Sequence, residues 1–286
     1  MSISEQKLQA QASERGHHNH PNDYYWKPGM ALRPPPGRVK NTPRYFHARK
    51  FMLNGLREQR IDMIPQGPGD YEDRYNDQFW EGDELMDKVV AAMKRTPGGG
   101  GKARAMFDQA LHQGIDSVDN PPEEFVALFN QLDAEPDWLD WDKLDRGTRI
   151  FSNLPGIYKT LNGIIDAVFN TNSAAVSLAT GATGRFNRQK ENRFIESITL
   201  FTTLSEPEGM RRYGSGFATG VHIRLMHAYV RRALSKREGL YDYDFHGNPI
   251  SSADSLPAGP LFGIGVLLIM RAFGMNVRQD EMEDVD

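Results

Sequence analysis

The sequence predicts an all-α fold, a single multi-helix bundle domain, and three observations support this. Apolar residues recur at intervals of three and four along most of the chain, which is the spacing of one helix face. No stretch alternates between apolar and polar residues at period two, so no strand is indicated. Hydrophobic residues make up 39% of the 286 residues and aromatic residues 10%, enough to fill a core. We therefore expect eight or more helices around one core.

The chain divides into an N-terminal arm and a helical domain. Residues 1–43 are polar and rich in Pro, His and Arg, and their RPPPGR stretch is typical of stiff, extended backbone. We expect this arm either to wrap the domain or to stay mobile. Helical spacing begins near Tyr45, so residues 44–286 are expected to form the domain.

Apolar stripes indicate the first helices of the domain. One helix is expected within residues 48–64, before the PQGPGDYED stretch breaks the pattern. The next covers residues 82–95, and Asp83 is expected to cap its start. The TPGGGGK stretch at residues 96–102 is expected to be a flexible loop, because it lacks the Ser or Thr of a phosphate-binding loop. The stripe of the 82–95 helix consists of Leu85, Val89 and Met93.

Three further segments continue the helical pattern. Residues 102–114 are amphipathic and end at a glycine typical of a helix C-terminus. Residues 120–132 begin with two prolines, which favour a helix start. In residues 135–151, Trp138 and Trp141 are expected to anchor a helix whose acidic start is capped and solvated, rather than a hydrolase with paired carboxylates. The apolar face of the 120–132 helix contains Phe125, Leu128, Phe129 and Leu132.

The second half of the chain starts with a segment of small residues. Residues 154–183 are small and apolar, which would let helices approach one another or a flat ligand closely. Residues 185–204 and 217–236 then show helical stripes. A turn-rich connection at residues 241–250 leads to a last helix expected within residues 256–275.

Charge and cysteine content exclude several classes of protein. The net charge of −4 and the isoelectric point near 6.1 give no basic surface for nucleic acid. The chain has no cysteine, which excludes disulfides, thiolate zinc sites, iron–sulfur clusters and thiolate-ligated haem. Any metal must therefore be held by His, Asp, Glu or Tyr.

The sequence also indicates where in the cell the protein is expected. The N-terminus has no apolar segment and no small-residue cleavage site typical of a secretory signal, so a cytoplasmic protein is expected. The longest uncharged run, residues 255–270, is short and interrupted by Pro and Gly. It favours a buried helix over a membrane span.

The 217–236 helix carries a histidine among apolar residues. His227 borders the expected buried stripe, whereas His222 lies about 140° away around the helix and cannot join the same site. Two interpretations remain open: a hydrogen-bonded core histidine, or a metal ligand. The expected buried stripe consists of Ile223, Met226, Val230 and Leu234.

Two arginines accompany this histidine. Arg224 and Arg231 share the face of His227, one turn on either side. Guanidinium groups at inward positions need anions, because an unpaired buried charge is very costly. Protein carboxylates could supply these anions, and so could the two propionates of a haem.

Five blocks of sequence carry a resemblance to a known family. In order they are DWLDWDKLDRG, SLATGATGR, NRFIESITLF, VHIRLMHAYVRR and HGNPIS. Together they resemble the rubber oxygenases (latex-clearing proteins) and the related MpaB-type oxygenases, over about residues 80–275. The resemblance implies an all-α fold around a haem b pocket and the use of dioxygen to cleave isoprenoid double bonds.

The resemblance also implies roles for individual residues. His227 matches the proximal ligand of the haem iron. Arg193 and Ser197 match an Arg-x-x-x-Thr element near the haem, with a hydroxyl kept at the second position. Glu196 departs from the family, because rubber oxygenases carry a lysine there. The chain also stops where family members continue, so the family's C-terminal helices are expected to be missing.

These observations predict a haem b-dependent oxygenase that uses dioxygen on an apolar, unsaturated, terpenoid or lipid-like molecule. The expected site consists of His227 on iron, Arg193 and Ser197 as catalytic and haem-contacting residues, and Arg224 and Arg231 at the propionates. One alternative is a helical protein that binds haem or an apolar ligand without turnover. The other is a helical scaffold without a small-molecule site.

Overall fold

The computed structural model describes residues 33–40, 75–158, 160, 199–200, 202–235, 241–255 and 263–285. Within these ranges the chain forms helices, turns and loops and no strand, which confirms the all-α prediction. The expected helix at 48–64, and most of the segment from 154 to 198, lie outside the described residues. The helices that lie wholly within these ranges are α2 (Gly37–Lys40), η2 (Gln78–Trp80), α5 (Glu84–Arg95), α6 (Gly99–Gln113), η3 (Ile115–Ser117), α7 (Glu123–Asp133), α8 (Trp141–Ser152), α13 (Ser215–Ser235), α14 (Tyr243–His246), α15 (Ser252–Ser255), α17 (Ile264–Ala272) and α18 (Gln279–Val285).

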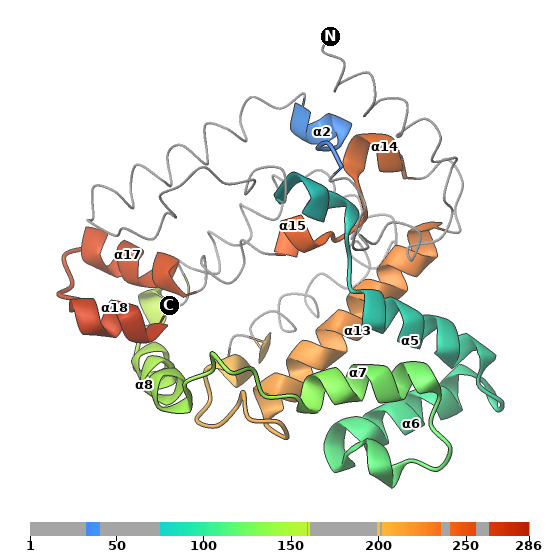
Figure 1. Ribbon diagram of the computed structural model, residues 1–286. Coiled ribbons are helices and arrows are strands. Elements are labelled where there is room, and N and C mark those ends of the chain that lie inside the picture. Colours follow the sequence, from blue (N-terminus) through green and yellow to red (C-terminus); the bar gives the residue numbers. More distant parts are fainter. Residues whose placement is uncertain are drawn as a thin grey trace.

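Four helices, α5, α6, α7 and α13, form the main core (Figure 1). Local signals set their ends. The Asp83 side chain accepts a hydrogen bond from the Met86 backbone N–H at 3.1 Å, which confirms it as the cap of α5. The Gly114 N–H donates to the Ala110 carbonyl at 3.0 Å, which confirms the end of α6.

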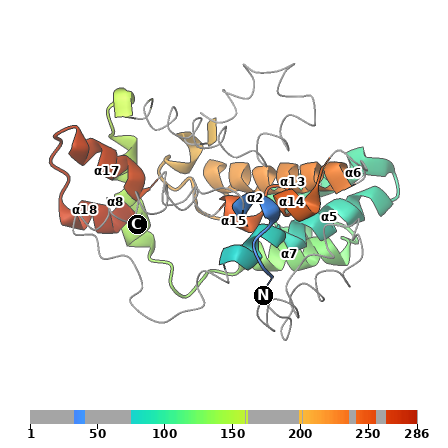
Figure 2. The same cartoon turned by 90° about the horizontal axis from the view of Figure 1, so that it is seen from above.

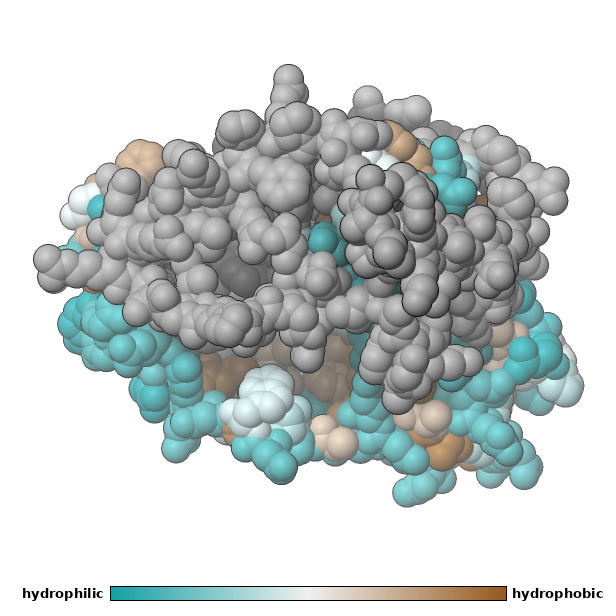
Figure 3. Space-filling view, turned by 45° about the horizontal axis from the view of Figure 1, so that its top comes forward, coloured by the Kyte–Doolittle hydropathy of each residue, from teal (hydrophilic) through white to brown (hydrophobic). Residues whose placement is uncertain are grey.

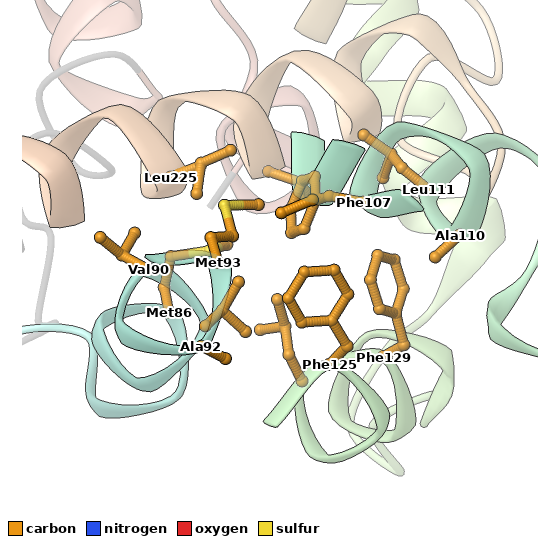
Figure 4. Packing of buried hydrophobic residues seen from close by; sticks show 14 of the residues in the cluster. Met86, Val90, Ala92, Met93, Phe107, Ala110, Leu111, Phe125, Phe129 and Leu225 are labelled. Atoms are coloured by element: carbon orange, nitrogen blue, oxygen red, sulfur yellow. The ribbon is translucent and has the colours of Figure 1, made fainter. Parts of the chain in front are cut away.

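Three phenylalanines fill the centre of this core (Figure 4). The Phe107 ring from α6 lies edge-on to Phe125 at 5.9 Å between centroids and tilted against Phe129 at 5.5 Å. Edge contacts of this kind are favourable because the ring edge is positive and the face negative. Leu225 of α13 is fully buried in the same cluster, and so are Val89 and Met93 from the predicted face of α5. The apolar faces predicted for α5 and α7 therefore meet here.

A second apolar cluster lies to one side of the main core (Figure 2). It joins α8, α17 and α18, and Arg146 of α8 pairs with Asp284 of α18 at 2.7 Å. The sequence did not indicate α18, in which Met282 is buried. The cluster supports the buried-helix interpretation of the uncharged run, part of which is α17. Its buried residues are Leu154, Val266, Leu267, Met270, Val277 and Met282.

The described part of the N-terminal arm packs on the domain. Arg33 is buried and pairs with Asp77 at 2.6 Å. Arg38 pairs with Asp254 at 2.8 Å and donates to the His246 carbonyl at 2.7 Å. Residues 33–40 therefore pack against the domain, and the rest of the arm lies outside the described residues.

Two local predictions were wrong. α6 begins at Gly99, so part of the glycine stretch expected to be a flexible loop is helical. Trp138 was expected to anchor a helix but is 81% exposed, because it lies in the turn before α8. Trp141 lies in the first turn of α8 and is half-buried.

The described surface is mostly hydrophilic on the face shown in Figure 3. Large exposed apolar side chains include Trp138, Ile157 and Phe273. None of the described helices has the length and apolar character needed to cross a bilayer.

Candidate functional site

The helix that carries the candidate histidine is α13, Ser215–Ser235, which is 21 residues long. Its contact with the core differs from the prediction. Val221, Leu225 and Ala228 are buried in the main core, so they form the core-facing side. The predicted stripe lies on the opposite side, and of its members only Leu234 is buried. The prediction was wrong because α13 is apolar on both sides, and periodicity does not tell which side the core uses.

His227 lies roughly 130° around α13 from the core-facing side and is half-buried. It borders a second apolar face of the helix. This second face, defined by Ile223, Met226 and Val230, is half-buried as well. The structure thus places His227 next to apolar side chains that the main core does not use.

Arg224 pairs with residues of α5 and α7. Its guanidinium donates to the Asp83 carboxylate at 2.6 and 3.1 Å and to the Gln131 side-chain oxygen at 3.0 Å. This pair fixes the start of α5 against α13.

Arg231 makes a fully buried pair with α5. Its Nε donates to both Asp87 oxygens, at 3.0 and 2.9 Å, and its Nη1 donates to the Ile250 carbonyl at 3.2 Å. The exposed fractions of the two side chains are 2% and 3%. Of the two anion sources left open by the sequence, protein carboxylates are the ones found beside both arginines.

His222 lies on another side of α13, as helical spacing predicts. Its Nε2 is 2.9 Å from Asp108 Oδ1, and the same carboxylate accepts two hydrogen bonds from Arg104. The ring of His112 lies 6.4 Å from the His222 ring. Even so, no three His, Asp or Glu side chains within the described ranges are close enough to hold a metal ion.

Arg193, Glu196 and Ser197 lie outside the described residues, and so does most of the small-residue segment 154–183. Their grouping with His227 stays a prediction.

The sequence did not predict a groove at the start of α13. The groove has a volume of about 620 Å³ and lies between the α7–α8 connection and the turn at 207–214. Arg211 stacks on the Trp141 ring at 3.9 Å and pairs with Asp145 at 2.9 Å. Acidic residues, Glu135 and Glu208, also line it. This charged lining does not suit an apolar substrate. In the sequence, only the RR pair in EGMRRYGSG indicated a charged site here.

The comparisons with known proteins identify no family. No protein-family model, curated protein or solved structure matches this chain. The resemblance to the rubber oxygenases therefore depends on the five sequence blocks alone.

A haem b group needs an axial ligand and partners for its propionates. His227 fits the first requirement, because a half-buried imidazole at the edge of an apolar face can offer a nitrogen to iron. Arg224 and Arg231 do not fit the second, because Asp83 and Asp87 already neutralise them. A second carboxylate beside Arg231 would be repelled by Asp87. Both arginines are therefore engaged by protein carboxylates and not by a propionate.

Asp83 provides a pH-dependent contact in this region. Burial alone would raise the pKa of Asp83, but the hydrogen bond and the charge of Arg224 and the Met86 N–H lower it below its ordinary value. A carboxyl with a lowered pKa in the folded state stabilises the fold above its unfolded-state pKa, and this stabilisation is lost as pH falls through the folded-state value.

Asp83→Asn is therefore expected to reduce the pH dependence of stability in acid. Asparagine caps a helix about as well as aspartate, so the variant removes the charge and leaves the cap. Between about pH 5 and pH 3 the free energy of unfolding should fall less steeply in the variant than in the wild type. Urea unfolding at several pH values measures both slopes, and equal slopes would contradict the role of this ion pair.

Proposed function

We propose that the protein is a haem b-dependent oxygenase that uses dioxygen on an apolar, unsaturated, terpenoid or lipid-like molecule, with His227 as the iron ligand. The observation that supports the proposal is the place of His227 in the fold. It lies half-buried beside the second apolar face of α13, the longest described helix, in a chain without cysteine.

In this proposal, residues of the chain bind the haem iron and shield the site from water. One ring nitrogen of His227 would hold the iron, and a hydrogen bond to the other nitrogen would fix the tautomer of the ring. Ile223, Met226 and Val230 offer an apolar surface that keeps water from this side of the site. When bound, haem b supplies the chemistry that activates dioxygen. Arg193 and Ser197 keep the catalytic role implied by the family resemblance.

A second candidate is a protein that binds haem or an apolar ligand without turnover. Its support is the composition of the His227 side of α13. Within the described helix, the second apolar face offers no acid or base besides His227 at its edge, since the neighbouring arginines are occupied by carboxylates. Glu196, which stands where rubber oxygenases carry a lysine, also favours a protein that binds without turnover.

An absorption spectrum of the protein produced with ample haem tests both candidates. We expect a Soret band in the wild type and a loss of haem affinity of at least about tenfold in His227→Ala, because the proposed iron ligand is removed. His222→Ala is the matched control, since it removes a histidine from the same helix but on a different side, beside Asp108. It should keep the band.

The outcomes separate the candidates. A wild type without a Soret band, or a band of equal strength in His227→Ala, would contradict haem ligation by this residue. If the band is present, oxygen uptake with an unsaturated terpenoid distinguishes an oxygenase from a binding protein. Circular dichroism of both variants checks that their helices are intact.

A further inference from the structure

Buried polar atoms without a hydrogen-bond partner gather in one part of the described fold. We call this part the polar seam: the contact between residues 77–83 and residues 241–254, together with Arg231 of α13. The Asn248 N–H donates to the Phe79 carbonyl at 2.8 Å, and the Ser252 N–H donates to the Glu81 carbonyl at 2.8 Å. The unpaired atoms in the seam are Gln78 Oε1, Arg231 Nη2, Tyr241 Oη, His246 Nδ1, Asn248 Oδ1 and Asn248 Nδ2.

Arg231 and Asn248 are the most enclosed of these residues. Asn248 has no exposed surface, and neither its amide oxygen nor its amide nitrogen has a partner. A Cβ added to Gly82 would lie 2.9 Å from Arg231 Nε and 3.0 Å from Asn248 Nδ2. Arg231 Nε and Asn248 Nδ2 therefore lie on the same side of the Gly82 backbone and less than about 6 Å apart, the span of two successive hydrogen bonds through one bridging atom.

Buried polar groups in folded proteins are almost always hydrogen-bonded, because a buried unpaired donor or acceptor loses its hydration without compensation. An asparagine amide that has neither group paired is an exception, and it calls for a partner other than the side chains in the described part of the chain. Ordered water is the usual partner in such places, since it both donates and accepts.

The charges around the seam decide the kind of partner. Arg231 is paired with Asp87, Arg33 with Asp77 and Arg38 with Asp254, so each cation already has its carboxylate. An anion would be repelled by these carboxylates and a cation by the guanidinium groups. The balanced charges favour a neutral molecule, and the complete burial of Asn248 favours a small one.

We propose that the polar seam holds buried water, with at least one molecule that accepts a hydrogen bond from Arg231 Nη2 and donates one to Asn248 Oδ1. This water joins α13 to the turn that contains Asn248. The site is independent of the proposed haem ligation, and its test does not involve haem.

A high-resolution crystal structure tests the proposal directly. We expect density for a water oxygen within hydrogen-bond distance of both Arg231 Nη2 and the Asn248 side chain. In solution, oxygen-17 magnetic relaxation dispersion counts long-lived buried water. Asn248→Leu should lower this count by about one, because an apolar side chain of similar size cannot hold the molecule. Asn276→Leu, at an exposed position, is the matched control and should leave the count unchanged.

Three results would overturn the proposal. One is a crystal structure in which Arg231 and Asn248 bond directly to each other with no water between them. Another is an organic molecule bound at this place. The third is a wild-type protein without long-lived water, a result that stands even if Asn248→Leu does not fold.

Discussion

Arg231→Met is expected to lower the free energy of unfolding by about 3–5 kcal/mol, because it leaves the Asp87 carboxylate buried without its partner. Both side chains are almost fully buried, and the pair links α5 to α13. Methionine keeps most of the length and the apolar stem of arginine, so lost packing is a small part of the effect. Urea unfolding at neutral pH measures the difference.

The double variant Arg231→Met/Asp87→Leu separates the cost of an unpaired buried charge from the cost of losing the contact between α5 and α13. Replacement of a buried ion pair by apolar residues is often close to neutral, so the double variant should recover most of the loss. Arg95→Met is the control, because Arg95 pairs with Glu124 at the surface and is 65% exposed. It should cost less than about 1 kcal/mol. A loss in Arg231→Met no larger than in Arg95→Met would contradict the role of the buried pair.

Local signals predicted much of the fold. Asp83 and Gly114 were identified as helix ends from the chemistry of caps, which involves residues only three or four positions apart. The apolar face of α7 was identified because that helix has a single apolar side, with Phe125 and Phe129 on it. Such features are local, so a sequence is enough to predict them.

Features that depend on distant residues were missed. α13 is apolar on both sides, and only the position of α5, α6 and α7 decides that Leu225 faces the core and Ile223 does not. The partner of Arg231 lies 144 positions earlier in the chain, so the sequence left its anion open. α18 is mostly acidic, and it is held by Met282 and by the pair of Asp284 with α8, neither of which gives a periodic pattern.

In the candidate site too, local features were predicted and features that depend on distant residues were missed. The sequence indicated His227 and separated it from His222 by helical geometry, and the structure agrees with this separation. From the sequence we also expected Arg224 and Arg231, beside His227, to bind the propionates of a haem. Their pairing with α5 shows that charges near a histidine are informative only once their partners are known.

Phe107→Ala is expected to lower the free energy of unfolding by about 3–5 kcal/mol. The Phe107 ring is fully buried and contacts the rings of Phe125 and Phe129, so its removal loses both apolar burial and two aromatic contacts. The neighbouring rings come from α7 and cannot close the cavity without moving that helix. Phe107→Leu keeps much of the volume and should cost less than half as much.

Phe273→Ala tests whether this loss comes from burial rather than from the removal of any phenylalanine. Phe273 is 66% exposed and makes one edge contact with Tyr158, at 6.3 Å between ring centroids. Its replacement should cost less than about 1 kcal/mol. Urea unfolding of the three variants should therefore rank Phe107→Ala well above Phe107→Leu, and Phe273→Ala last. If Phe107→Ala were as mild as Phe273→Ala, the ring could not lie at the centre of a packed core, because only a loosely packed site tolerates such a cavity.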